Sequence, residues 1–176
     1  DTNEDPDKSF NERIKAGFEM AYKKGIDYFF AIGSVANYIT ESFSKSGSGS
    51  SAKPSLAIAA KYVKAKYKSK RDMKPLQPKD IFQLKGFVSM GNDAACYKNR
   101  LSEAWGVMPV EAAAGTESTC IAVESWERNG MVFFPDACFY EFIPEAEMQR
   151  SLKDKEYIPR TCLMKDVETG ESYELV

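Results

Sequence analysis

The sequence predicts an α/β fold, a layered mixed sheet with flanking helices in which the last third of the chain is mostly antiparallel strands. Through residue 117, helical apolar spacing alternates with short apolar runs that end at glycine, an order typical of α/β proteins. Beyond residue 117, strand patterns follow one another with little helix between them. The 11 Phe, 9 Tyr and 2 Trp supply enough apolar surface for a packed core.

The chain opens with a helix, a strand and a second helix. Residues 10–24 carry apolar side chains at helical spacing, and Gly25 follows as a stop signal. The apolar run 26–33 is bounded by glycine and predicts a buried strand of a largely parallel sheet. Ser34 is predicted to cap a second helix that continues to about Ser44.

A connector and a lysine-rich helix come next. The Ser- and Gly-rich segment 44–53 indicates a flexible linker. Residues 54–67 predict a helix, and residues 68–80, which include two prolines, predict a loop.

Two strands that lead toward glycine turns flank another helix. The strands are predicted at 84–90 and 107–113, with the helix 93–105 between them and Gly106 beyond its end. In an open α/β sheet the loops that follow such strands lie side by side at the carboxyl edge, where ligands bind. The helix carries Lys98 and Arg100, which we expect to be surface charges.

The remaining sequence predicts five strands and one short helix, at 144–153. The turn 168–171 predicts a hairpin between the last two strands. Trp105 and Trp126 are both expected in the core or packed against a sheet. The five strands are predicted at 119–126, 131–134, 139–143, 160–167 and 172–176.

We expect residues 1–176 to be part of one large domain. Its α/β portion would comprise 1–46 and 53–117, and its β-rich portion 118–176.

Composition excludes several classes of function. There is no histidine, so a mechanism that needs an imidazole base is excluded within this chain, and a zinc site is not expected. The four cysteines are widely spaced and the start of the chain is acidic and polar, which together favour reduced thiols in a cytoplasmic protein. No run approaches the ~20 apolar residues that would span a bilayer.

Charge is unevenly distributed along the chain. Residues 53–79 carry nine positive charges against one Asp, whereas residues 101–176 carry six positive and fifteen negative charges. The basic block could contact nucleic acid or an acidic lipid surface. Its lysines are not interleaved with stacking aromatics, and only Arg71 offers a bidentate fork. We therefore favour a solvated helix face without a nucleic-acid partner, and keep nucleic-acid binding as a weaker alternative.

The residues that could form a ligand-binding site are concentrated at the ends of the two strands predicted at 84–90 and 107–113. Residues 111–117 end in Gly-Thr-Glu, and a hydroxyl beside a carboxylate at the end of a strand is suited to hold a phosphate and its magnesium ion. The second edge, 88–92, is another short apolar run that enters a glycine.

These features resemble the acyl-adenylate-forming superfamily, and most closely its branch of auxin-type acyl-acid amido synthetases with their bacterial relatives. Residues 24–34 are similar to the strand and turn that shape the acyl pocket, and 88–92 to the glycine loop that lies against adenine. Residues 113–117 resemble the aromatic-x-x-(Ser/Thr)-Glu motif. The segments 139–144 and 170–176 resemble two strands typical of the amido-synthetase branch.

The resemblance implies an ATP-dependent ligase that converts a small carboxylic acid to an acyl-AMP and transfers the acyl group to an amine or thiol acceptor. Thr116 and Glu117 would be the catalytic residues, with Thr116 at the α-phosphate and Glu117 holding Mg²⁺. Such chemistry depends on positioning and charge neutralisation and requires no histidine. The residues implied to bind the nucleotide are Met90, Gly91, Asn92, Ala114, Gly115 and Thr116.

The chain departs from this family pattern at several points. Ala113 stands where the family has an aromatic residue, which removes a stacking contact worth ~1–3 kcal/mol. Residues 48–54 superficially resemble the family's phosphate loop, but they follow a helix pattern and lie too close to Glu117. That loop is expected upstream, and the ribose-binding aspartate and mobile domain downstream, in the rest of the parent chain. We therefore expect a fragment that is inactive alone. The alternative is a non-catalytic module of the same fold that binds a small carboxylate or a nucleotide.

Overall fold

The computed structural model describes residues 8–46, 54–116, 118 and 120–176. The chain divides into two compact units. The first comprises residues 1–114 and 122–132, and the second comprises residues 115–121 and 133–176. None of the helices in the described part of the chain is long and apolar enough to cross a membrane.

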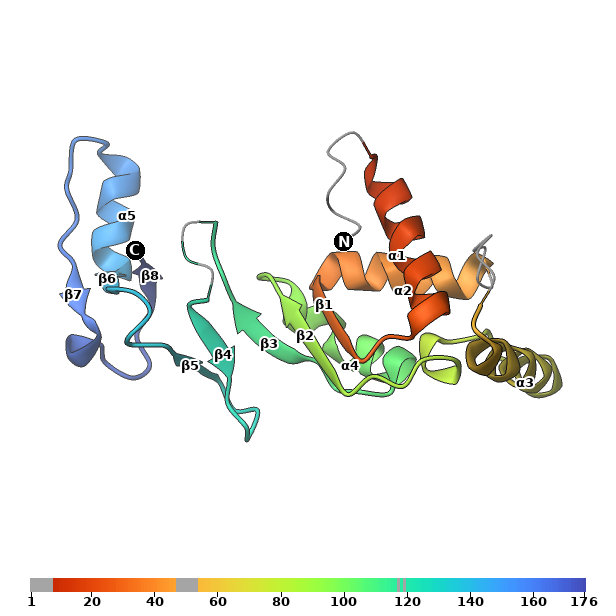
Figure 1. Ribbon diagram of the computed structural model, residues 1–176. Helices are drawn as coiled ribbons and strands as arrows, with labels where there is room; N and C mark the ends of the chain where they lie inside the picture. The colour runs from red at the N-terminus through yellow and green to blue at the C-terminus, as the bar shows by residue number, and fades with distance from the viewer. Residues whose placement is uncertain (1–7, 47–53, 117, 119) are drawn as a thin grey trace. The chain divides into compact units, whose positions relative to one another are not determined.

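A five-stranded sheet organises the first unit, with its strands in the order β1-β2-β3-β4-β5 (Figure 1). β1 (Tyr28–Ile32), β2 (Gly86–Met90) and β3 (Val110–Ala113) run parallel to one another. β4 (Ala122–Glu124) returns antiparallel to β3, and β5 (Met131–Phe133) is the last strand of the sheet. The predicted mixed sheet, parallel first and antiparallel afterwards, is confirmed.

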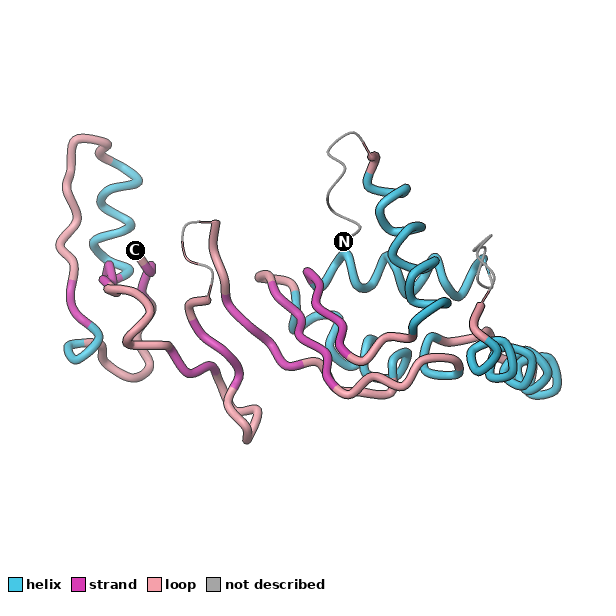
Figure 2. The backbone as a smooth tube through the Cα atoms, viewed as in Figure 1, coloured by secondary structure: helices cyan, strands magenta, loops and turns pink. Residues whose placement is uncertain are grey.

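Helices alternate with the parallel strands, as the sequence predicts (Figure 2). The α/β class with flanking helices is therefore confirmed. A 3₁₀ turn at Pro78–Asp80 precedes β2. The four helices of this unit are α1 (Phe10–Lys24), α2 (Gly33–Ser46), α3 (Leu56–Asp72) and α4 (Ala94–Trp105).

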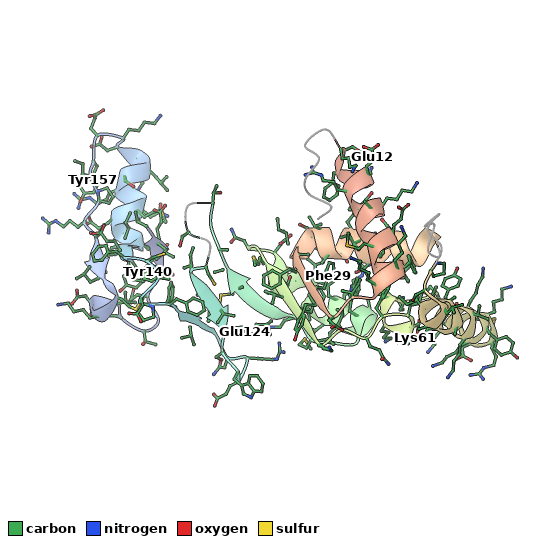
Figure 3. All side chains as sticks on the ribbon, in the orientation of Figure 1. Glu12, Phe29, Lys61, Glu124, Tyr140 and Tyr157 are labelled. Atoms are coloured by element: carbon green, nitrogen blue, oxygen red, sulfur yellow. The ribbon has the colours of Figure 1, made fainter. Side chains whose placement is uncertain are left out.

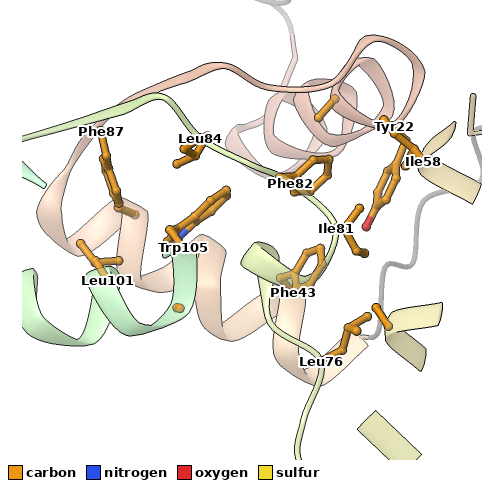
Figure 4. Close-up of a cluster of buried hydrophobic side chains, with 14 residues drawn as sticks. Tyr22, Phe43, Ile58, Leu76, Ile81, Phe82, Leu84, Phe87, Leu101 and Trp105 are labelled. Atoms are coloured by element: carbon orange, nitrogen blue, oxygen red, sulfur yellow. The ribbon is translucent and has the colours of Figure 1, made fainter. Parts of the chain in front are cut away.

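Trp105 lies at the centre of the aromatic core (Figure 4). The Trp105 ring centroid is 4.6 Å from that of Phe29 on β1 and 6.1 Å from that of Phe87 on β2. Its indole N–H donates a 2.9 Å hydrogen bond to Oγ1 of Thr40 on α2, so the buried donor is satisfied. Trp105 thus fastens α4 to both the sheet and α2, and its predicted core position is confirmed.

β1 is an edge strand, which corrects its prediction as a buried strand. It pairs only with β2, and Tyr28, Phe30 and Ile32 are all exposed on the side opposite Phe29. An unbroken apolar run reports hydrophobicity but gives no alternation from which a solvent-facing side could be recognised.

Two helix ends also differ from prediction. α2 begins at Gly33, so Ser34 lies inside the helix rather than capping it. α3 continues to Asp72, into the segment predicted as a loop, because Lys and Arg are good helix formers and the first proline comes only at position 75. Of the predicted linker 44–53, residues 44–46 belong to α2, and residues 47–53 lie outside the described part of the chain.

The second unit contains a small antiparallel sheet with the order β7-β6-β8. The central strand β6 (Glu141–Pro144) leads directly into α5 (Glu145–Lys153). β7 (Cys162–Leu163) passes into a 3₁₀ turn at Met164–Asp166, and β8 (Tyr173–Leu175) lies on the other side of β6. The predicted hairpin between the last two strands is therefore wrong, because each of them pairs with β6 instead of with the other.

Trp126 is the second correction to the predicted core. Its side chain is 99% exposed in the turn that connects β4 to β5. Ser125 N–H bonds to the carbonyl oxygen of Gly130, which closes this turn and leaves the indole in solvent.

Candidate functional site

The carboxyl ends of β2 and β3 lie next to each other. In the parallel register Val88 is opposite Val110 and Met90 is opposite Ala112. The turn that begins after Met90 and the segment that begins with Ala114 therefore leave the sheet at the same edge. This is the arrangement that open α/β sheets use to bind ligands.

The turn after β2 depends on glycine. Gly91 has φ of 101°, which L side chains rarely adopt, and a Cβ there would lie 3.2 Å from Asp93 Oδ1 and 3.3 Å from Ile32 Cγ2. Nearby, a Cβ on Gly33 would lie 2.9 Å from Ala94 Cα, so the first turns of α2 and α4 approach closely. Gly91 and Asn92 are exposed at this edge. The backbone there is accessible without a side chain at position 91.

The segment after β3 carries the predicted catalytic pair. Ala114, Gly115 and Thr116 are exposed, and Glu117 lies outside the described residues. Gly115 N–H donates a 2.8 Å hydrogen bond to the carbonyl oxygen of Ser118. Because Gly115 and Thr116 belong to the second unit and Gly91 to the first, a common site for Thr116 and Gly91 stays a prediction.

Cys138 and Tyr140 contact the returning arm of the same loop. Ser118 Oγ is 2.8 Å from Cys138 Sγ. The Tyr140 hydroxyl is 3.1 Å from the carbonyl oxygen of Ile121 and 3.0 Å from that of Phe134. Burial, followed by the neighbouring Cys138, raises the pKa of Tyr140 above its ordinary value, so it remains a neutral donor. These contacts fix the base of the Thr-Glu loop within the second unit.

A charged cluster that we did not predict lies beside β3. Lys98 of α4 contacts two carboxylates, Glu111 on β3 at 2.8 Å and Glu124 on β4. The side chains of Lys98, Glu111 and Glu124 are only 18%, 16% and 6% exposed. Glu124 Oε2 also accepts a hydrogen bond from the backbone N–H of Glu111. We call these residues, together with Arg128, the Lys98 cluster.

Arg128 completes this cluster from the turn after β4. Its guanidinium donates to Glu124 Oε2 at 3.2 Å and to the carbonyl oxygens of Pro109 at 2.8 Å and Met108 at 3.3 Å. Arg128 has φ of 57°, a left-handed conformation that costs roughly 1–2 kcal/mol for a non-glycine residue. The cluster makes four contacts to β3 and to residues 108–109 before it, and these contacts hold the strand that leads to Ala114.

Lys98 and Glu124 both keep their charged forms. Burial disfavours the charged form of Lys98, but the hydrogen bonds from its ammonium to Glu111 and Glu124 outweigh burial and raise the pKa of Lys98. Burial likewise disfavours ionised Glu124, yet the bonds from Lys98 and the Glu111 backbone hold its pKa below the ordinary value. The ammonium of Lys98 and the carboxylate of Glu124 therefore meet as ions between α4 and the sheet.

The prediction that Lys98 is a surface charge is wrong, and the sequence contained the signal. Lys98 lies four residues after Ala94 and three before Leu101, and both of those residues are buried. The side chain thus emerges from the apolar side of the helix. Arg100 lies on the other side of α4, where it is exposed and bonds Glu41 at 2.9 Å.

No group of three or more Cys, Asp or Glu side chains within the described ranges is placed to hold a metal ion. That search does not bear on Mg²⁺ held by one carboxylate and the oxygens of a nucleotide.

Comparison with known proteins gives one family match. Residues 131–176 match the family model described as the GH3 family central domain. Two of the resembling segments, 139–144 and 170–176, lie inside the matched range, which is consistent with the amido-synthetase branch of the acyl-adenylate-forming superfamily. No curated protein and no solved structure gave a match.

Proposed function

We propose that this chain is part of the large domain of an ATP-dependent acyl-acid ligase, most similar to the amido synthetases. The reaction would join a small carboxylic acid to ATP, release pyrophosphate, and pass the acyl group to an amine or thiol. The observation that supports the proposal is the register of β2 and β3, which brings the Gly91 turn and the segment that begins with Ala114 to one sheet edge. The family match at residues 131–176 supports the same class.

In this proposal the substrate carboxylate attacks the α-phosphorus of ATP, an acyl–phosphate bond forms, and the bond to the β-phosphate oxygen breaks. Thr116 would donate a hydrogen bond from its hydroxyl to an α-phosphate oxygen as negative charge builds there. The exposed backbone at Gly91 and Asn92 would lie against the flat face of adenine, and Met90, Ala114 and Gly115 would line the same edge.

The oxygen donors of the loop suit magnesium, since Mg²⁺ prefers hard oxygen ligands and keeps several waters. Glu117 is the residue that would hold the ion, which neutralises charge on the phosphates when bound. A cytoplasmic setting belongs to the same proposal, and it is supported by the four cysteines being free thiols.

The proposal is tested by ATP–pyrophosphate exchange in the complete parent enzyme with a panel of carboxylic acids. Exchange stimulated by one class of acid establishes adenylation. Glu117→Ala should lower exchange by about 10²-fold or more, since it removes the residue assigned to Mg²⁺. The matched control is Glu127→Ala, because Glu127 is an exposed carboxylate in the turn after β4. Normal exchange in Glu117→Ala would contradict the assignment of Glu117 to Mg²⁺.

A second candidate function is favoured by Ala113. This residue pairs with Ala122 between β3 and β4 and offers no ring to stack on adenine. The fold would then serve as a non-catalytic module that binds a small carboxylate or a nucleotide. Folded parent protein that binds either ligand in calorimetry but shows no exchange with any acid would favour this module over the ligase.

A further inference from the structure

We propose that the outer face of α3 is a docking surface for an anionic lipid bilayer. This helix has two apolar sides. On the packed side Ile58 and Ala65 are buried in the core, and Tyr62 lies partly buried beside them. The backbone N–H of Ser55 bonds the carbonyl oxygen of Tyr22 at 3.0 Å, so the start of the helix is also fastened to the unit.

The second apolar side faces away from the core. Leu56, Ala60, Val63 and Tyr67 recur at the helical spacing of one face. Leu56 is 92% exposed, Val63 68% and Tyr67 72%. Ile58, Ala65 and Tyr62 occupy the opposite face, so α3 cannot rotate to bury this stripe without losing its core contacts. Part of its apolar surface is thereby held in solvent, an arrangement that favours a partner.

Cations border this outer stripe on both sides. Lys64 and Arg71 are four residues beyond Ala60 and Tyr67, and Lys66 and Lys70 are three residues beyond Val63 and Tyr67. The single acidic residue of the helix, Asp72, bonds to Arg71 at 2.8 Å. Figure 3 shows the long side chains of α3, including Lys61, extending from the helix. The basic residues of α3, all exposed, are Lys61, Lys64, Lys66, Lys68, Lys70 and Arg71.

The charge and shape of the outer face of α3 together favour an anionic bilayer as its partner. A helix with an apolar face and flanking lysines lies in the plane of a bilayer interface, with its apolar side chains among the acyl chains and its ammonium groups at the headgroups. A cluster of four to eight cations on such a helix is typical of binding to anionic lipid. The 17-residue helix is about 25 Å long at its usual rise, enough for many headgroups to contact it.

Two other anionic partners fit less well. Nucleic-acid binding draws on stacking aromatics and guanidinium forks, and the stripe offers only Tyr67 and Arg71 for those contacts. An acidic amphipathic helix normally docks in an apolar groove, whereas the outer face of a single helix is convex. A deformable headgroup layer accommodates a convex ridge.

Co-sedimentation of the 176-residue chain with vesicles tests this proposal directly. We expect binding to phosphatidylcholine vesicles that contain phosphatidylserine, little binding to phosphatidylcholine alone, and weakening of the first as salt rises. Lys64→Glu with Lys68→Glu should lower the partition coefficient roughly tenfold or more. Lys153→Glu with Lys165→Glu, in the second unit, is the charge-matched control and should change it much less.

The apolar stripe is tested separately. Changing Leu56, Val63 and Tyr67 to Ser should weaken vesicle binding and remove the part that resists salt. The same change at Trp126, Leu152 and Ile158, which are equally exposed elsewhere, is the matched control. Circular dichroism checks that each variant is folded.

The proposal is overturned if the wild-type chain ignores phosphatidylserine vesicles at low salt, or if α3 variants and controls bind equally. Binding to an oligonucleotide that Lys64→Glu with Lys68→Glu abolishes, with no vesicle binding, would assign α3 to nucleic acid instead. None of these outcomes depends on the ligase proposal.

Discussion

α3 and α4 are both helices that carry lysine, yet they use it in opposite ways. On α4, Lys98 extends toward the sheet and bonds two carboxylates, one on β3 and one on β4. On α3 every lysine is exposed, and the apolar stripe between them is exposed as well. The difference comes from what each helix faces. β3 and β4 present Glu111 and Glu124 to α4, whereas the outer side of α3 faces solvent.

This comparison shows that charge counts along a segment do not reveal which charged side chains are buried in tertiary contacts. The basic block 53–79 carries nine of the chain's 24 cations, but the lysines of α3 within it are all exposed. One lysine outside that block joins α4 to β3 and β4, next to the strand that leads to the Gly-Thr-Glu loop. The most direct test of this difference is to make the same substitution on both helices.

The largest difference is expected for leucine. Leu101 on α4 is fully buried, and Leu101→Ala should lower the free energy of unfolding by about 2–5 kcal/mol because it removes packed methyl groups and leaves a cavity. Leu56→Ala on α3 should change it by less than about 0.5 kcal/mol. The measurement is urea unfolding followed by Trp105 fluorescence in a Trp126→Phe background, which leaves one buried tryptophan. Equal effects of the two substitutions would contradict the assigned burial.

The lysines should differ by a smaller amount. Lys98→Met keeps the length of the side chain but leaves Glu111 and Glu124 without their ammonium partner, so we expect a loss of about 1–3 kcal/mol. Lys64→Met on α3, the matched control, should leave the free energy of unfolding unchanged. The same fluorescence-detected urea titration measures both. A Lys98→Met protein as stable as wild type would mean that the ion pairs of Lys98 contribute nothing to holding β3.

The sequence predicts the fold well where spacing alone decides the structure. α1, α4 and the parallel strands follow from helical periodicity, apolar runs and the glycines at 25, 91 and 106. Strand pairing is harder to predict from the sequence. The turn at Gly170 predicts a hairpin between β7 and β8, but both of these strands pair with β6 instead. The exposure of Trp126 could not be predicted, because it lies in a short turn where no helical or strand periodicity indicates which side chains are buried.

Site prediction from the sequence was similarly uneven. The adjacency of the two strand ends follows from the order of strands and helices, and the register of β2 and β3 agrees with it. A common site for the two loops stays a prediction. Predicting the Lys98 cluster requires knowledge of which residues of β3 and β4 face α4, because its members are far apart in the sequence. Only the position of Lys98 among buried α4 residues could have indicated it.

The smallest expected effect concerns pH and separates the Lys98 cluster from surface charge. The pKa of Glu124 is held below its ordinary value of 4.5, and that of Lys98 is raised above 10.5. A lowered carboxyl pKa gives stability that is complete above pH 4.5 and is lost as pH falls through the folded pKa, because the unfolded chain then binds more protons. A raised ammonium pKa gives stability that is complete below pH 10.5 and is lost as pH rises through the folded value.

Glu124→Gln should therefore flatten the acid limb of the stability profile, since an amide has no proton to gain there. Glu127→Gln, in the exposed turn that follows β4, should leave that limb as steep as in wild type. Urea unfolding at a series of pH values below neutrality, again followed by Trp105, measures the slope for the three proteins. If Glu124→Gln and wild type lose stability in parallel below pH 4.5, the carboxylate of Glu124 is not held ionised by Lys98. The distinction between the lysine of α4 and those of α3 would then rest on packing alone.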